Sequence, residues 1–241
     1  TYYAKARNLD PDKIVSVSIM PCTAKKFEAN RPEMHDSNYR DIDYVLTTRE
    51  LAIMIKQAGI DFLKLKDMHF DRLLGESTGA GVIFGATGGV MEAALRTAYE
   101  IVTGREVPFD NLNITPVRGI EGVREASIKI ENTLKAWSFL EGVELKCAVA
   151  HGLVNAKKIM DSIVSGKSHY HFIEFMACPG GCLGGGGQPI PTSPEIRAKR
   201  AEAIYAEDEG MPVRKSHLNP EVIKIYKDFL ITPLGEKSHH L

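Results

Sequence analysis

The sequence has 241 residues, of which 44% are hydrophobic and 25% charged, and its formal net charge is −1 at neutral pH. A chain of this length can bury a sizeable core in one large domain or in two lobes. Its charge balance gives no reason to expect a nucleic acid or an anionic membrane as partner, and no apolar run approaches the roughly 20 residues that a membrane-spanning helix needs.

The first predicted strand covers residues 14–20, where β-branched apolar residues alternate with serine. This period of two is typical of a strand with one face more buried than the other. The strand should end at Pro21, which cannot donate a hydrogen bond to a neighbouring strand. We therefore expect Cys22 and Lys25 on the following loop or first helical turn, where open α/β sheets often carry their active groups.

The first of two glycine-rich stretches covers residues 75–89, GESTGAGVIFGATGG, and leads into a predicted helix over 90–103. A glycine loop before a helix could bind phosphate through its free backbone N–H groups. However, neither the P-loop motif nor the dinucleotide-binding motif is present, so nucleotide binding is disfavoured.

Period and turn signals predict the remaining elements. Strands are expected over 42–46, 114–118, 125–130, 143–150 and 171–177, and helices over 49–58, 155–164, 194–209 and 221–230. Thr48 should cap the first of these helices. The last two helices are highly charged and have few core residues, so we interpret them as a solvated belt on the main domain, without chemistry of its own.

The second glycine-rich stretch covers residues 175–189, FMACPGGCLGGGGQP, in which Cys178 and Cys182 stand four residues apart. Thiolates are soft ligands that suit iron–sulfur clusters, zinc or copper(I). A structural zinc site usually shows two close Cys/His pairs, whereas Cys22 stands without a nearby histidine, so zinc is disfavoured. Cys147 could supply a fourth thiolate by count, but its place within a predicted strand favours a small buried hydrophobe.

Two motifs carry a resemblance to a known family. The stretch FMACPGGC, followed by GGGQP two residues later, and residues 20–28, MPCTAKKFE, resemble the third and second signatures of the [FeFe], or iron-only, hydrogenases. The resemblance extends from about residue 14 to the C-terminus and includes a tail similar to the family's small subunit. The family's first signature is absent, and the amino end has neither an initiator methionine nor a signal peptide. We therefore expect the chain to be the C-terminal part of a longer polypeptide.

The resemblance implies an α/β fold. It would have two lobes with mostly parallel sheets flanked by helices, site loops at the carboxyl ends of strands, and a helical C-terminal tail. Residues 1–190 would form the C-terminal part of the domain that holds the family's catalytic H-cluster, and residues 191–241 would form the small-subunit-like segment.

The resemblance also implies the site. An H-cluster is a [4Fe–4S] cubane joined through a cysteine sulfur to a di-iron unit that bears CO, cyanide and a dithiolate bridge. By motif position the cubane ligands would be Cys22, Cys178 and Cys182, the last also bridging to the di-iron unit. Lys25 would donate hydrogen bonds to a cyanide and, with Cys182, act in catalysis. The dry pocket around the di-iron unit would be lined by Met20, Phe84 and Met176.

The activity implied is the reversible oxidation of dihydrogen to protons and electrons in anaerobic hydrogen metabolism. Ferredoxin or another carrier would exchange the electrons through upstream iron–sulfur domains or subunits, and maturation proteins would insert the cofactor. The cytoplasm is the expected compartment, with the periplasm left open. Two alternatives remain: a hydrogenase-like iron–sulfur protein without a di-iron unit, acting in cluster assembly or binding, and a hydrogen sensor. Because relatives of the first kind degrade the second motif, the intact MPCTAKK favours the enzyme.

Overall fold

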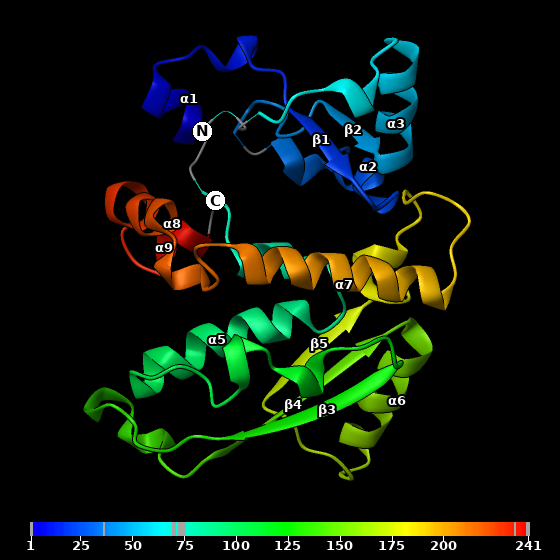
Figure 1. The fold of residues 1–241 in the computed structure, drawn as a ribbon. Coiled ribbons are helices and arrows are strands. Elements are labelled where there is room, and N and C mark those ends of the chain that lie inside the picture. The colour runs from blue at the N-terminus through cyan, green and yellow to red at the C-terminus, as the bar shows by residue number, and fades with distance from the viewer. Residues whose placement is uncertain (1, 36, 69–70, 72–75, 234, 240–241) are drawn as a thin grey trace. The chain divides into compact units, whose positions relative to one another are not determined.

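The computed structural model describes residues 2–35, 37–68, 71, 76–233 and 235–239. The chain divides into two compact units (Figure 1). Unit 1 comprises Thr1–Gly75, Gly185–Pro191 and Lys224–Leu241, and unit 2 comprises Glu76–Gly184 and Thr192–Ile223. Within the described parts of the chain, no helix is both long enough and apolar enough to cross a membrane.

Unit 1 contains a two-stranded parallel sheet, in which β1 (Val17–Met20) pairs with β2 (Tyr44–Thr47). Both strands were predicted, and β1 starts three residues later than expected. The helices of this unit are α1 (Tyr2–Arg7), α2 (Ala24–Glu28), α3 (Thr48–Gln57) and α9 (Glu236–His239). Thr47 caps α3 in place of the predicted Thr48, because its hydroxyl accepts a hydrogen bond from the Glu50 N–H while the Glu50 carboxylate accepts one from the Thr47 N–H.

Unit 2 contains a three-stranded sheet in the order β3-β4-β5. Strand β4 (Glu144–His151) pairs antiparallel with β3 (Val123–Lys129) and parallel with β5 (Phe172–Met176). Its helices are α4 (Gly79–Val82), α5 (Gly89–Thr103), α6 (Leu153–Val164) and α7 (Pro194–Gly210), while α8 (Pro220–Ile225) runs from unit 2 into unit 1. The predicted α/β class is confirmed, and the sheets are mixed: two of the three strand pairings are parallel.

The core of unit 2 lies on both faces of β4, with α5 and α6 on opposite sides of the sheet (Figure 1). Cys147 and Val149 contact the side chains of α5, whereas Ala148 and Ala150 pack against Ile159 of α6. Side chains alternate between the faces of a strand, so a strand buried on both sides reads as a continuous apolar run. This is the origin of the CAVA run at residues 147–150.

The strand predicted over 114–118 is wrong. The chain there forms a 3₁₀ turn, Thr115–Val117, with Pro116 in its first positions. Ile114 and Val117 are both fully buried. Apolar residues three apart fit one face of a tight turn, and proline favours such a turn over a paired strand.

The buried face of α5 includes charged residues. Ile101 is 44% exposed, whereas Glu92 and Arg96 are fully buried. Charged residues are almost never fully buried unless they are paired. The pattern of apolar residues alone could not identify this face, because two of its members are an ion pair.

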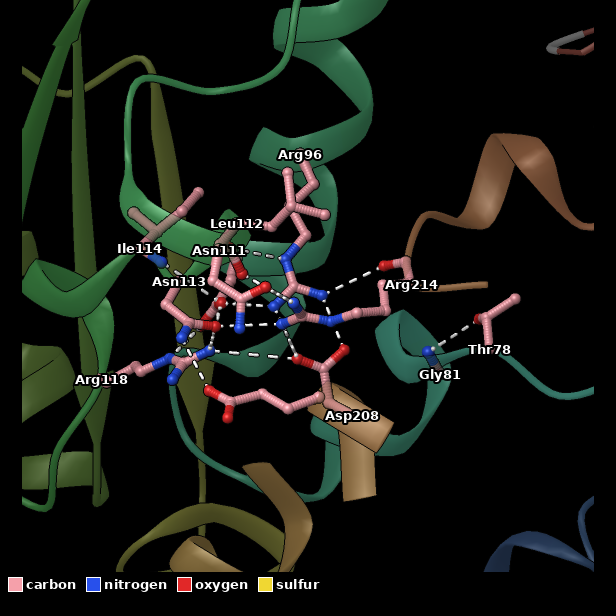
Figure 2. A network of polar contacts seen from close by, with 12 residues as sticks. Thr78, Gly81, Arg96, Asn111, Leu112, Asn113, Ile114, Arg118, Asp208 and Arg214 are labelled. Carbon is pink, nitrogen blue, oxygen red and sulfur yellow. Dashed lines mark hydrogen bonds and ion pairs between the residues drawn. The ribbon is translucent and has the colours of Figure 1, made fainter. Parts of the chain in front are cut away.

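A buried network of ion pairs joins α5 to α7 (Figure 2). Arg96 binds Asp208 of α7 through two nitrogen–oxygen contacts of 2.8 Å and contacts Glu92 at 2.7 Å. Arg118 binds Glu92 at 2.7 and 2.8 Å, and Arg214 reaches Asp208 at 2.6 Å. Burial alone would raise the pKa of Asp208, but the hydrogen bonds and charges of Arg96 and Arg214 hold that pKa below its ordinary value. The helix predicted as a solvated belt is therefore anchored by a buried carboxylate.

We expect Asp208→Ala to lower the free energy of unfolding by about 3–5 kcal/mol, because it leaves the buried Arg96 cation without its main partner. Urea unfolding followed by the fluorescence of Trp137, the single tryptophan and a residue of unit 2, measures this change. The matched control is Asp161→Ala, which removes an exposed ion pair with Lys157 on α6 and should cost no more than about 0.5 kcal/mol. Equal losses in the two variants would contradict the role of the network.

The same comparison has a defined pH dependence. Because the pKa of Asp208 is lowered in the folded state, its contribution to stability is present above its ordinary value of 3.8 and is lost as the pH falls through the folded-state value. The difference in unfolding free energy between wild type and Asp208→Ala should therefore be constant near neutral pH and shrink in acid.

Candidate functional site

Cys178 and Cys182 lie on the loop that follows β5 in unit 2; neither forms a disulfide, and both are half-buried. The loop turns back on itself, and the Gly181 N–H donates to the Cys178 carbonyl at 3.0 Å. Gly180 and Gly181 adopt φ values of +80° and +86°, a region that other residues enter only at a cost. One tight turn at the carboxyl end of a strand thus carries two thiols.

The two glycine-rich stretches contact each other within unit 2. The Thr87 N–H donates to the Gly180 carbonyl at 3.0 Å. A Cβ atom added at Gly181 would lie 2.7 Å from the Thr87 nitrogen, and one added at Gly184 would lie 2.0 Å from the Pro179 carbonyl oxygen. At these two positions the absence of a side chain allows one backbone segment to approach another closely. Gly75, the first residue of the earlier stretch, lies outside the described residues.

The N-terminus of α5 is occupied by a carboxylate of the protein itself. Glu174 of β5 is buried and accepts hydrogen bonds from the backbone N–H groups of Gly88 at 2.6 Å and Met91 at 2.7 Å. Burial raises the pKa of Glu174, although these N–H groups and the Arg124 charge oppose the shift. A phosphate at this helix end would have to displace a carboxyl group that already accepts these N–H groups, which agrees with the interpretation that disfavoured nucleotide binding.

Phe84 and Met176 differ in their surroundings. Phe84 lies in the 3₁₀ turn Ile83–Gly85 and is 46% exposed, whereas its neighbour Ile83 is fully buried. Phe84 therefore does not fill the core. Met176 is the half-buried last residue of β5, paired in register with His151 of β4.

In unit 1, Met20 is the last residue of β1, and the half-buried Cys22 follows two residues later. The loop that carries Cys22 contacts the end of the third motif, since the Gly187 N–H donates to the Pro21 carbonyl at 2.8 Å. A Cβ atom at Gly187 would lie 2.9 Å from the side chain of Thr47. The run of four glycines therefore passes from unit 2 into unit 1, with its last residues packed on the second motif.

Lys25 is a residue of the short helix α2, and its ammonium group contacts the Glu28 carboxylate at 2.6 and 2.7 Å. Glu28 is the last residue of α2 and pairs with Lys25. The neighbouring Lys26 binds Glu50 at 2.8 Å, as a cation in solvent contact does. Hydrogen bonds from Lys26 and then from Thr47 lower the pKa of Glu50 to about 2.

Two basic side chains, Arg124 and His151, lie beside segments that adjoin the cysteine loop of unit 2, and sequence analysis missed them. Arg124 is buried and donates to the carbonyl of Thr87, the residue that contacts Gly180. Burial lowers the pKa of Arg124. Burial also lowers the pKa of His151, with further contributions from the charges of Arg124 and Arg197. The Nδ1 atom of His151 is buried without a hydrogen-bond partner among the described residues.

Cys147 is 1% exposed and lies in the core between the sheet and α5, as predicted. Burial raises the pKa of its thiol to about 11, so it is protonated at neutral pH. A metal ligand must be a thiolate. The residue is thus unsuited to supply a fourth ligand.

The donors available for a metal are divided between the units. Cys178 and Cys182 belong to unit 2, and Cys22 belongs to unit 1. Across the described part of the chain, no three His, Cys, Asp or Glu side chains form a ready metal cage. The residues nevertheless suit an iron–sulfur cluster, because soft thiolates on a tight loop are joined by cationic groups that favour an anionic occupant.

Comparison with known proteins gives two family matches. Residues 1–186 match the model for the iron-only hydrogenase large subunit, C-terminal domain, and residues 194–241 match the iron hydrogenase small subunit. The chain is 49% identical to the NADP-reducing hydrogenase subunit HndD of Solidesulfovibrio fructosivorans over its full length, covering 39% of that protein. It is 51% identical over 86% of its length to the periplasmic [Fe] hydrogenase large subunit of Nitratidesulfovibrio vulgaris, covering 46% of that protein.

More distant relatives carry a different description. The cytosolic Fe–S cluster assembly factor narfl of Xenopus tropicalis is 32% identical over 95% of the chain, which covers 47% of that protein.

Among solved structures, the [FeFe]-hydrogenase HydA1 of Chlamydomonas reinhardtii superposes with a TM-score of 0.83 and 40% identity. The match covers all of this chain and 65% of HydA1. The chain spans half or less of the length of the curated relatives it matches.

Proposed function

The chain belongs to the iron-only hydrogenase family, and we propose that it forms part of an enzyme that reversibly oxidises dihydrogen at an H-cluster. The cysteine loop carries this proposal, because it presents Cys178 and Cys182 on one turn beside cationic side chains. The second motif supplies Cys22 and Lys25 on consecutive parts of unit 1. Folding alone does not require these thiols and this lysine in the two motifs.

We assign Cys22, Cys178 and Cys182 as the cubane ligands, with Cys182 also bridging to the di-iron unit. The fourth thiolate would come from the family's first signature motif, which these 241 residues do not contain. The bound H-cluster would supply heterolytic cleavage of dihydrogen and electron storage. The protein would hold the group, exclude water and polarise it.

Lys25 would compensate the negative charge of a cyanide ligand of the di-iron unit by donating hydrogen bonds to it. A buried anionic acceptor is costly unless a donor faces it, and an ammonium group offers a compact charge with three N–H donors. In the structure this ammonium binds Glu28, with the Lys25 side chain 42% exposed, so it would have to exchange that carboxylate for the cofactor. Apolar side chains of Met20, Phe84 and Met176 would keep water away from the di-iron unit.

The two regions of the chain would have separate tasks. We propose that residues 1–190 are the C-terminal part of the H-cluster domain and that residues 191–241 act as its small-subunit-like segment. Dihydrogen and protons would be the substrates, and ferredoxin or another carrier would exchange electrons through additional iron–sulfur domains or subunits. Maturation proteins would insert the cofactor. The cytoplasm is the proposed compartment, although one relative is named as periplasmic.

An infrared spectrum of the full-length protein, matured and purified without oxygen, tests the proposal together with an iron and sulfide count. CO and cyanide stretching bands that shift under hydrogen are expected. Iron and sulfide without those bands would contradict the hydrogenase activity and favour the second candidate, a cluster-assembly or binding role. That candidate rests on the assembly-factor relatives. Turnover rate would then separate an enzyme from a hydrogen sensor.

A further inference from the structure

Two arginines of α7 contact the cysteine loop of unit 2. The Cδ atom of Arg197 lies 3.2 Å from the position that a Cβ atom would take at Gly180, and 3.0 Å from the corresponding position at Gly184. Arg200 donates to the Leu183 carbonyl at 2.8 Å. Residues three apart share one face of a helix, so this face of α7 lies along the loop that carries both thiols.

The surroundings of the Arg197 guanidinium differ from those of Arg96, Arg118 and Arg214. Arg96, Arg118 and Arg214 all bind buried carboxylates. No hydrogen bond or ion pair joins the guanidinium of Arg197 to a residue that the structure describes, although its charge contributes to the lowered pKa of the exposed Glu195 and its aliphatic stem packs on the loop. Its field reaches the end of β4, where it contributes to the lowered pKa of His151.

We propose that Arg197 is a positioning residue that holds the Cys178–Cys182 loop and raises the reduction potential of the iron–sulfur cluster bound there. The inference rests on the proposed function, since it requires a cluster on these thiolates. One electron taken from an external reductant adds one negative charge to the cluster. A fixed cation beside the ligand loop favours the form with more negative charge. The small-subunit-like segment would thereby tune a cofactor whose ligands all lie outside it.

The geometry also explains why α7 is anchored so firmly. Asp208, near the end of the helix, is locked to Arg96 of α5, which fixes the helix that carries Arg197. The anchor fixes the backbone that carries Arg197, and the packing of its side-chain stem on Gly180 and Gly184 keeps its charge near the loop. A charge close to a cluster is screened less by salt than one farther out in solvent.

The test is a redox titration of the full-length, cluster-loaded protein with dithionite, in which the reduced cubane is followed by electron paramagnetic resonance. Three variants are compared: Arg197→Gln, Arg197→Lys and Lys199→Gln. Lys199 lies on the same turn of α7, is exposed, and loses the same charge on substitution. At the wild-type midpoint potential, Arg197→Gln should show about a tenfold lower ratio of reduced to oxidised cluster, equivalent to about 59 mV for one electron.

Arg197→Lys should recover most of the wild-type ratio, and Lys199→Gln should leave it unchanged. A wild-type ratio in an Arg197→Gln protein with full iron and sulfide would overturn the inference and leave the proposed function intact. Equal changes of this ratio in Arg197→Gln and Lys199→Gln would also overturn the inference. They would indicate that the net charge of the protein, and not the position of Arg197, sets the potential. A wild-type protein without iron and sulfide would refute the proposed function itself.

Discussion

Cys182→Ala is expected to lose the di-iron unit and all hydrogen turnover. The bridge between the proposed cubane and the di-iron unit needs a thiolate at this position, and alanine offers no ligand atom. The neighbouring turn should persist, because its φ angles and its contact with Thr87 depend on Gly180 and Gly181. Infrared spectroscopy should show no CO or cyanide bands, and hydrogen uptake and evolution should fall to background.

Cys147→Ala is the matched control for Cys182→Ala. It removes one buried sulfur from the core and should cost about 1 kcal/mol of stability while keeping the bands and the turnover. Hydrogen turnover retained in the Cys182→Ala protein would contradict the assignment of Cys182 as a ligand. Turnover lost in the Cys147 variant, with folding intact, would mean that the core thiol has been misjudged.

Lys25→Ala is expected to reduce hydrogen turnover at least a hundredfold, the effect typical of removing one donor that stabilises a developing or bound anion. The loss cannot arise from the ion pair with Glu28, because both side chains are more than a third exposed and such pairs contribute only about 0–1 kcal/mol. Steady-state hydrogen evolution with a chemical reductant measures the change, and the infrared bands of the variant report whether a cofactor is present.

The control for Lys25 lies beside it in sequence. Lys26→Ala removes the same charge from α2 but only breaks the contact with Glu50, so its turnover should stay within about twofold of wild type and its stability should fall by no more than about 1 kcal/mol. A Lys25 variant with normal rates would remove that residue from the site. Similar losses in both variants would point to the charge of α2 as a whole.

Much of the fold could be predicted from sequence because most elements carry local signals. The alternation before Pro21, the apolar run around Cys147 and the Ser193-Pro194 cap each predicted an element that the structure contains. The failures have a common cause. Ile114 and Val117 fit a strand by hydrophobicity, and Glu92 and Arg96 fit a solvated face, yet each is buried because of a partner distant in sequence. A local sequence pattern does not contain information about partners that are distant in sequence.

The sequence was sufficient to predict the motif residues of the candidate site, but not the residues that surround them. The cysteines, glycines and Lys25 could be identified because their motifs are contiguous. Arg197 could not, since it stands in a charged helix with no motif, and only the packing of α7 on Gly180 and Gly184 reveals it. The spacing of Arg197 and Arg200 was visible, but nothing in the sequence indicated that their shared face met a loop.

The burial of Cys147 has a consequence for damage by air. With a pKa of about 11, on the order of one Cys147 thiol in ten thousand is ionised at pH 7. Sulfenic acid formation and alkylation both proceed through the thiolate and need access to it. Once a cofactor is lost to oxygen, thiol oxidation in this chain is therefore expected at its three half-buried cysteines, and those are the proposed ligands. The protein would lose the ability to be reloaded well before its core is attacked.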